Sequence, residues 1–266
     1  MRRLLLIGIG TGDLDHVTVQ AVAALNAFDV LFLVIKEGAD ELAAVRRRVL
    51  ERHRTVGAYR TVELADPPRP WREAPDYREA VAHWRERRVE LWGDAISTGL
   101  AAGETGAFLV WGDPSLYEST LAVVSEIADR GAVGTPDRAG TPARGTVGID
   151  YEVIPGVSSI HALTARHRIP LNRVGGAVQI TPARLLGGGM PPGVDDVVVM
   201  LDAGAAFATI PPAGIDIYWG AYLGTPDELL IRGRLGDVAE KIARVRKEAK
   251  ERKGWIFDTY LLRRTG

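Results

Sequence analysis

A Gly-Asp-Pro turn at residues 112–114 directly follows an apolar run, 108–111, and precedes the segment STLAVVSEIADR, residues 119–130. The run is typical of a buried strand, and the segment after the turn is typical of an amphipathic helix. Open parallel sheets bind their ligands just beyond the carboxyl ends of the strands. We therefore expect a ligand at this turn, where Gly112 allows close approach and Pro114 fixes the backbone.

A second glycine turn, GIGTGD at residues 8–13, follows the apolar start of the chain. Gly8 and Gly10 have the spacing of a dinucleotide-binding turn, but Asp13 stands where the third glycine belongs, and the next strand runs into Lys36. The pattern leaves open a nicotinamide or flavin site and a plain strand-to-helix turn. No glycine cluster is followed by Gly-Lys-Ser/Thr, which disfavours ATP chemistry.

Ser158 and Ser159 follow a third turn, Pro155-Gly156, and open a helical pattern. The segment lacks the closing glycine of a nucleophile elbow, so two interpretations remain: the serines cap the helix, or their hydroxyl and N–H groups hold a ligand there. His161 and His167 fall on different faces of the same helix, which predicts structural histidines rather than a metal pair. The chain has no cysteine, which excludes disulfides and thiolate chemistry and fits a reducing, cytoplasmic location.

Arginines gather with aromatic residues between positions 69 and 92. The set comprises Arg69, Arg72, Arg78, Arg85, Arg87 and Arg88, with Trp71, His83, Trp84 and Trp92. It could grip a large aromatic polyanion, but acidic residues alternate with the arginines, as on a solvated helix with i,i+4 pairs. Both interpretations stay open. Arg166, Arg168 and Arg173 form either a patch at the domain junction or the favourable cations of a helix C-terminus. With 33 Lys and Arg against 34 Asp and Glu, the net charge of -1 argues against a generic nucleic-acid binder.

The elements that must position these residues alternate between strand and helix in the first part of the chain. Strands are expected at residues 4–9, 30–35, 59–64, 108–111 and 150–154, and helices at 19–28, 40–53, 76–103, 119–130 and from 159. Thr18 is the expected N-cap of the first helix. After residue 166 the pattern becomes rich in strands, at 177–181, 197–201, 215–223, 228–235 and 255–262, with one helix at 236–253. These patterns predict an α/β protein with two tandem domains, residues 1–165 with a parallel sheet and residues 166–266.

Four segments resemble, in order and spacing, the tetrapyrrole methyltransferase family. They are residues 4–32, VWGDPSLY at 110–117, VIPGVSSIHALTARHRIPL at 153–171 and YLGTPDELLIRGRLGDV at 222–238. The resemblance implies two α/β domains, with S-adenosylmethionine in the cleft between them and S-adenosylhomocysteine as a product. Segments 66–71, 76–92, 166–176 and 254–264 are similar to family members of cobalamin biosynthesis that methylate a corrin carbon and release acetate.

The resemblance also implies a set of cofactor-binding residues. They are Gly8, Gly10, Thr11, Gly112, Asp113, Pro114, Leu116, Ser158, Ser159, Met200, Ala221 and Gly224. Thr11 stands where the family has proline. Asp13 and Tyr117 are the predicted catalytic residues, because polar groups on turns that face the cofactor can move protons.

The expected partners are a small-molecule tetrapyrrole and a second copy of the chain, since family members are commonly dimers. No metal or nucleic acid is expected as a partner. No membrane is expected either, because every apolar stretch is shorter than the roughly 20 residues that a membrane span needs. Three alternatives stay open: a diphthine or ribosomal RNA methyltransferase of the same fold, a nicotinamide-dependent oxidoreductase, and a non-catalytic tetrapyrrole carrier. Equilibrium titration with S-adenosylhomocysteine and with NADH separates the methyltransferases from the oxidoreductase.

Overall fold

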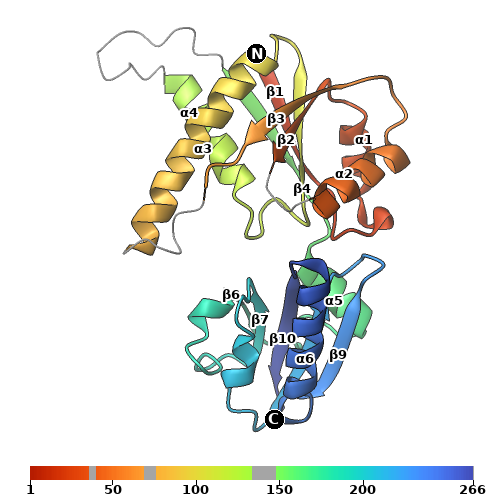
Figure 1. The fold of residues 1–266 in the computed structure, drawn as a ribbon, viewed down its shortest axis with the longest axis vertical. Helices are drawn as coiled ribbons and strands as arrows, with labels where there is room; N and C mark the ends of the chain where they lie inside the picture. Colours follow the sequence, from red (N-terminus) through yellow and green to blue (C-terminus); the bar gives the residue numbers. More distant parts are fainter. Residues whose placement is uncertain (36–39, 69–75, 134–147, 266) are drawn as a thin grey trace. The chain divides into compact units, whose positions relative to one another are not determined.

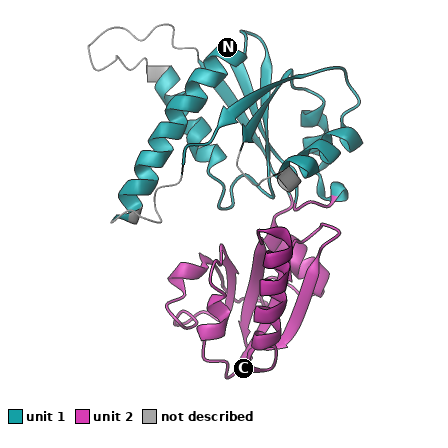
Figure 2. Cartoon of the chain, viewed as in Figure 1, with its two compact units in different colours: residues 1–10, 14–156 teal, residues 11–13, 157–266 magenta. Residues whose placement is uncertain are grey.

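A computed structural model describes residues 1–35, 40–68, 76–133 and 148–265. The chain forms two compact units, coloured separately in Figure 2. Unit 1 comprises residues 1–10 and 14–156, and unit 2 comprises residues 11–13 and 157–266. The short segment 11–13 thus belongs with the second unit although it lies near the start of the chain.

Unit 1 alternates strand and helix along the chain (Figure 1). Its strands are β1 (Arg2–Gly8), β2 (Val30–Ile35), β3 (Arg60–Ala65), β4 (Thr105–Val110) and β5 (Ile149–Ile154), and its helices are α1 (Val19–Leu25), α2 (Asp40–His53), α3 (Tyr77–Gly99) and α4 (Thr120–Val133), with a 3-10 turn, η1 (Leu14–His16). The strands are all parallel and lie in the order β3-β2-β4-β1-β5. The parallel sheet predicted for the first part of the chain is confirmed.

Strand β1 shows why this sheet is covered on both faces. Leu4 and Leu6 pack in a core with α3 and α4, whereas Leu5 and Ile7 pack in a second core with α1 and α2. Side chains alternate between the two faces of a strand, so a central parallel strand needs an unbroken apolar run. Because β4, β1 and β5 are parallel neighbours, their carboxyl ends lie at the same edge of the sheet, where the glycine turns begin.

Unit 2 holds a mixed sheet (Figure 1). Its strands are β6 (Val178–Pro182), β7 (Asp196–Met200), β8 (Ile215–Ala221), β9 (Leu229–Arg234) and β10 (Asp258–Arg264), its helices are α5 (Ser159–His167) and α6 (Leu235–Lys253), and its 3-10 turns are η3 (Ala183–Leu185) and η4 (Ala206–Thr209). The strand order is β6-β7-β10-β8-β9, with β6 and β7 parallel and the other pairs antiparallel.

Helices α5 and α6 cover opposite faces of this sheet. Helix α6 contributes Leu235, Ile242 and Ala249 to a core that also contains Trp219. On the other face, α5 packs so closely that a Cβ on Gly220 would lie 2.8 Å from Leu163. Helix α5 is therefore part of unit 2, whereas the domain boundary predicted between residues 165 and 166 would place most of it in the first domain.

His167 is buried at the end of α5, and its Nε2 donates a hydrogen bond to the carbonyl oxygen of Trp219 at 3.0 Å. Burial lowers the pKa of this histidine from its ordinary value of 6.5. The unfolded chain therefore binds a proton at a higher pH than the folded chain, and the free energy of unfolding falls as the pH drops below about 6.5.

We expect His167→Gln, which keeps an N–H for the Trp219 carbonyl, to remove this part of the pH dependence. Urea titrations of both proteins between pH 5 and 8 measure the difference. Equal slopes of stability against pH in that interval would contradict the assignment to His167.

Three internal segments of the chain, residues 36–39, 69–75 and 134–147, lie outside the described residues. They contain Arg69, Trp71 and Arg72 of the arginine-rich set. No helix among the residues that the structure does describe is long and apolar enough to cross a membrane.

Candidate functional site

Three glycines meet at the carboxyl edge of the unit 1 sheet. Gly8 ends β1, Gly112 follows β4 and Gly156 follows β5. A Cβ on Gly8 would lie 2.6 Å from the backbone nitrogen of Gly156, and a Cβ on Gly156 would overlap the carbonyl oxygen of Gly112. We call this the three-glycine contact. It has room for backbone alone, which is the physical reason for glycine at each turn.

Gly10 extends this contact to the turn after β4. Its carbonyl oxygen accepts a hydrogen bond from the nitrogen of Gly112 at 2.8 Å, and its own nitrogen donates to the carbonyl oxygen of Gly112 at 3.3 Å. Both residues have positive φ, +73° and +69°. The structure thus brings the predicted residues Gly8, Gly10 and Gly112 together, and it adds Gly156, which the sequence identified only as a turn.

Asp113 fastens two of these turns to each other. Its Oδ2 accepts a hydrogen bond from the nitrogen of Gly156 at 2.9 Å, and its Oδ1 accepts one from the nitrogen of Ser115 at 2.9 Å. The carboxylate of the Gly-Asp-Pro turn therefore links the turn after β4 to the turn after β5. Deleting it would leave two backbone N–H groups without these acceptors.

Pro114, Leu116 and Tyr117 complete the turn before α4. Pro114 is buried and Leu116 is partly buried. Tyr117 has φ +50° and is 44 % exposed. Left-handed backbone is uncommon for a residue with a side chain and occurs where the surrounding structure demands it, often at functional sites.

In unit 2, the segment 11–13 packs against the turn after β8. A Cβ on Gly224 would lie 2.6 Å from Oγ1 of Thr11 and 2.9 Å from the nitrogen of Asp13. Thr11 is 2 % exposed. Gly224, with φ +78°, is therefore the residue that lets the two turns approach.

Arg166 of α5 links the same two turns by charge. Its Nη2 lies 3.2 Å from Oδ2 of Asp13, and its Nε lies 3.1 Å from Oε2 of Glu228. Glu228 also accepts a hydrogen bond from the nitrogen of Gly224 at 2.8 Å. The hydrogen bond to Glu228, with the charges of both carboxylates, raises the pKa of Arg166. Arg166 is therefore an ionic bridge within unit 2, which the sequence did not predict.

Ser158 and Ser159 stand at the start of α5. Ser158 occupies the N-cap position, but its side chain accepts no capping hydrogen bond. Its Oγ lies 2.8 Å from Nδ1 of His161. The expected helix cap is therefore absent from this serine, and its hydroxyl is paired with an imidazole instead.

Met200 and Ala221 are the last residues of β7 and β8. Each is followed by a residue with positive φ, Leu201 at +55° and Tyr222 at +50°. Leu201 is also 60 % exposed, so an apolar side chain stands in solvent at the end of this strand. These turns share with Tyr117 a residue that bears a side chain and has positive φ.

Beneath these strand ends lies a buried polar network. Nε of Arg246 lies 2.8 Å from Oδ2 of Asp258, and Nε1 of Trp219 donates to the same oxygen at 2.9 Å. Arg246 also donates to the carbonyl oxygen of Asp202, whose Oδ2 accepts from the hydroxyl of Tyr260 at 2.8 Å. Burial raises the pKa of Asp258, and the arginine opposes that shift. Asp258 pairs with Ala221 in the sheet, so the network lies next to Ala221, a predicted cofactor-binding residue.

Helix α3 has the predicted solvated face, but its Arg88 fits neither interpretation. Arg88 is 2 % exposed, and its Nε lies 2.8 Å from Oδ1 of Asp66. Its guanidinium carbon lies 4.4 and 4.1 Å from the ring centroids of Trp84 and Trp92. All three side chains are buried in unit 1. On the surface, Arg87 pairs with Glu90 at 2.9 Å, as expected for a solvated helix face.

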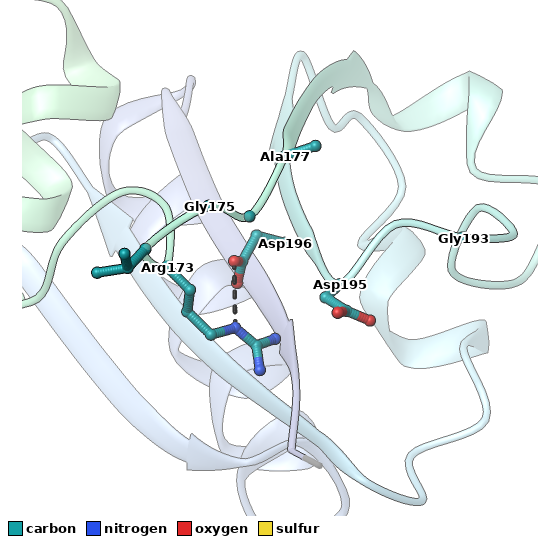
Figure 3. A pocket seen from close by; sticks show the side chains of 8 residues that line it. Arg173, Gly175, Ala177, Gly193, Asp195 and Asp196 are labelled. Atoms are coloured by element: carbon teal, nitrogen blue, oxygen red, sulfur yellow. Dashed lines mark hydrogen bonds and ion pairs between the residues drawn. The ribbon is translucent and has the colours of Figure 1, made fainter.

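Arg173 contacts a pocket of about 260 Å³ in unit 2 (Figure 3). Its side chain reaches Asp196, with Nε 3.4 Å from Oδ2, and Arg263 binds the same carboxylate. The rest of the wall is lined by Val174, Gly175, Gly176, Ala177, Gly193 and Asp195. Asp196 is thus shared by two arginines of unit 2.

Known proteins resemble the chain over nearly its whole length. Residues 3–239 match the family model of Tetrapyrrole (Corrin/Porphyrin) Methylases. The precorrin-6A synthase [deacetylating] of a Sinorhizobium species is 44 % identical over 265 residues, which are 99 % of this chain and 96 % of the relative.

Solved structures show the same architecture. A cobalamin synthesis related protein from Corynebacterium diphtheriae has a TM-score of 0.80 and 30 % identity, and all of each chain is covered. The uroporphyrin-III C-methyltransferase of Thermus thermophilus, solved with S-adenosylhomocysteine, has a TM-score of 0.57 and 19 % identity over 98 % of this chain and 91 % of that one. The predicted two-sheet α/β fold is confirmed.

Proposed function

The chain belongs to the tetrapyrrole methylase family, and from this premise we propose that it is a carbon methyltransferase of cobalamin biosynthesis. The proposed reaction methylates C-1 of precorrin-5 with S-adenosylmethionine, releases the acetyl group as acetate and gives precorrin-6A. The observation that carries the proposal is the full-length similarity to the deacetylating Sinorhizobium enzyme. The proposed setting is the cytoplasm, and the proposed assembly is a homodimer.

The residues fit a nucleoside ligand that bears an amino acid. On unit 1, the three-glycine contact and Gly10 bring bare backbone to the strand ends, beside Asp113, Pro114 and Leu116. On unit 2, apolar surface would come from the strand-end residues Met200 and Ala221. Hydroxyl groups would come from Thr11, which packs on Gly224, and from the serines of α5. We propose these residues as the set that binds S-adenosylmethionine.

When bound, S-adenosylmethionine supplies a methyl group already activated by the sulfonium charge. The chain's own residues must then align the acceptor carbon and keep water away from the methyl. The turns at Tyr117 and Leu201, whose positive φ is uncommon for residues with a side chain, are candidates for this task. Asp13 and Tyr117 remain the proposed proton-handling residues, and the contact with Arg166 holds the carboxylate of Asp13 in place.

With precorrin-5 and S-adenosylmethionine, we expect one acetate and one S-adenosylhomocysteine per turnover. Chelator-treated protein should keep this activity, since an activated methyl needs no Lewis acid. Enzymatic determination of both products measures the ratio. S-adenosylhomocysteine formed without acetate would reject the deacetylating reaction, and binding of NADH without S-adenosylhomocysteine would favour the oxidoreductase alternative.

Charge reversal at Arg166 is expected to weaken S-adenosylhomocysteine binding more than it raises the KM for precorrin-5. The variant Arg166→Glu places a third carboxylate beside Asp13 and Glu228 and loosens the turns that carry Thr11 and Gly224. The pair is partly exposed, so the loss should be about 1 kcal/mol, several-fold in Kd. Calorimetry measures it, with Arg168→Glu, at the C-cap of the same helix, as the control. A larger effect on KM than on Kd would instead indicate that Arg166 contacts the substrate.

A further inference from the structure

His161 and Ser158 form a pair that the sequence did not predict. The two residues are three apart at the start of α5, and Nδ1 of the imidazole lies 2.8 Å from Oγ of the serine. Ser158 is 4 % exposed, so the buried hydroxyl has a fixed position, whereas His161 is exposed. The result is an imidazole anchored on its inner nitrogen, with the rest of its ring towards solvent.

The outer nitrogen of this ring is available for chemistry. Among the residues that the structure describes, none hydrogen-bonds to Nε2 of His161. When Nδ1 carries the ring proton and donates it to Ser158, Nε2 keeps its lone pair and can accept a proton. The other histidine of this helix differs, since Nε2 of His167 is buried against the carbonyl of Trp219.

We propose that His161 is the general base that activates water for acetate release, and that Ser158 is its positioning residue. This inference rests on the proposed function, which requires attack of water on an acetyl carbonyl. His161 contacts Ser158, which belongs to the proposed binding set, so the ring and the methyl donor would serve one reaction centre. Asp13, with one oxygen paired to Arg166, and Tyr117 keep the other proton transfers of the reaction.

The step balances without any further reactant. Nε2 of His161 takes a proton from water while the water oxygen bonds to the acetyl carbonyl carbon. The carbon–carbon bond between the acetyl group and the macrocycle breaks, acetic acid leaves, and the electron pair stays on the ring carbon. The proton on Nε2 passes to solvent. The ring carbon is then the nucleophile that methylation requires, so acetate release comes first.

The variant His161→Asn tests the base. Its amide keeps an N–H near the position of Nδ1 for Ser158 but has no counterpart of Nε2. We expect acetate release from precorrin-5 to slow roughly 100-fold or more, the usual range for loss of a general base. S-adenosylhomocysteine formation should slow equally, while the Kd for S-adenosylhomocysteine changes less than twofold.

Two further variants separate chemistry from structure. In His161→Ala, added imidazole should restore part of the acetate release, because the site is open to solvent. Ser158→Thr, which keeps the hydroxyl, should retain more activity than Ser158→Ala. Wild-type rates in His161→Asn, a rate loss that follows weaker S-adenosylhomocysteine binding, or no rescue by imidazole would each overturn the assignment. Unmutated protein that releases no acetate would instead reject the proposed function itself.

Discussion

Replacing Gly156 with alanine is expected to destabilise unit 1 by about 3 kcal/mol or more, the upper end of the cost of overpacking. The added Cβ would overlap the carbonyl oxygen of Gly112 and lie 2.9 Å from the Cα of Gly8. All of these neighbours are backbone atoms of strand ends, which cannot move aside as a flexible side chain can. Chemical unfolding followed by circular dichroism measures the loss.

The matched control for this variant is Gly57→Ala. A Cβ on Gly57 would meet no atom within 4 Å, so its effect should stay within the roughly 0.5 kcal/mol typical of surface substitutions. Gly156→Ala should also weaken S-adenosylhomocysteine binding, because it displaces the turns of Gly8 and Gly112. A Gly156→Ala protein as stable as the control would show that the three-glycine contact is looser than described.

The second large effect is expected from Arg246→Met in the buried network of unit 2. The side chains of Arg246 and Asp258 are 8 % and 2 % exposed. Removing one partner of such a pair leaves a buried charge uncompensated, which costs about 3–5 kcal/mol. The loss of unfolding free energy should shrink as the pH falls. Burial already raises the pKa of Asp258, so its unpaired carboxyl then binds a proton in the folded state.

Two comparisons give this prediction its controls. Lys247→Met changes the next residue of the same helix. Its partner Glu251 is 3.8 Å away, and both side chains are more than half exposed. This variant should lower the free energy of unfolding by about 0.5 kcal/mol or less. The double variant Arg246→Met with Asp258→Asn removes both charges while an amide oxygen can still accept from Trp219. It should recover part of the loss, and a double variant no better than the single one would contradict the charge argument.

The sequence by itself determined the elements and the family. The strand at Val30–Ile35 and the helix at Asp40–His53 have the predicted bounds. Thr18 caps α1 as predicted, with its Oγ1 accepting from Ala21 at 3.0 Å. Apolar runs, glycine turns and capping residues are local signals, because each depends on neighbours within a few positions along the chain. The order of the turns then indicated the tetrapyrrole methylases, and the family match confirmed it.

Only the tertiary structure decided which of these signals meet. Gly156 closes on Gly8 and Gly112 because β1 lies between β4 and β5 in the sheet. Arg166 could have faced a substrate, yet it bridges two carboxylates that lie 153 and 62 positions away along the chain. Arg88, in a segment patterned like a solvated helix, is buried against Asp66. Such contacts depend on strand order and helix rotation, which set the distance between side chains remote in sequence, and no local pattern encodes that distance.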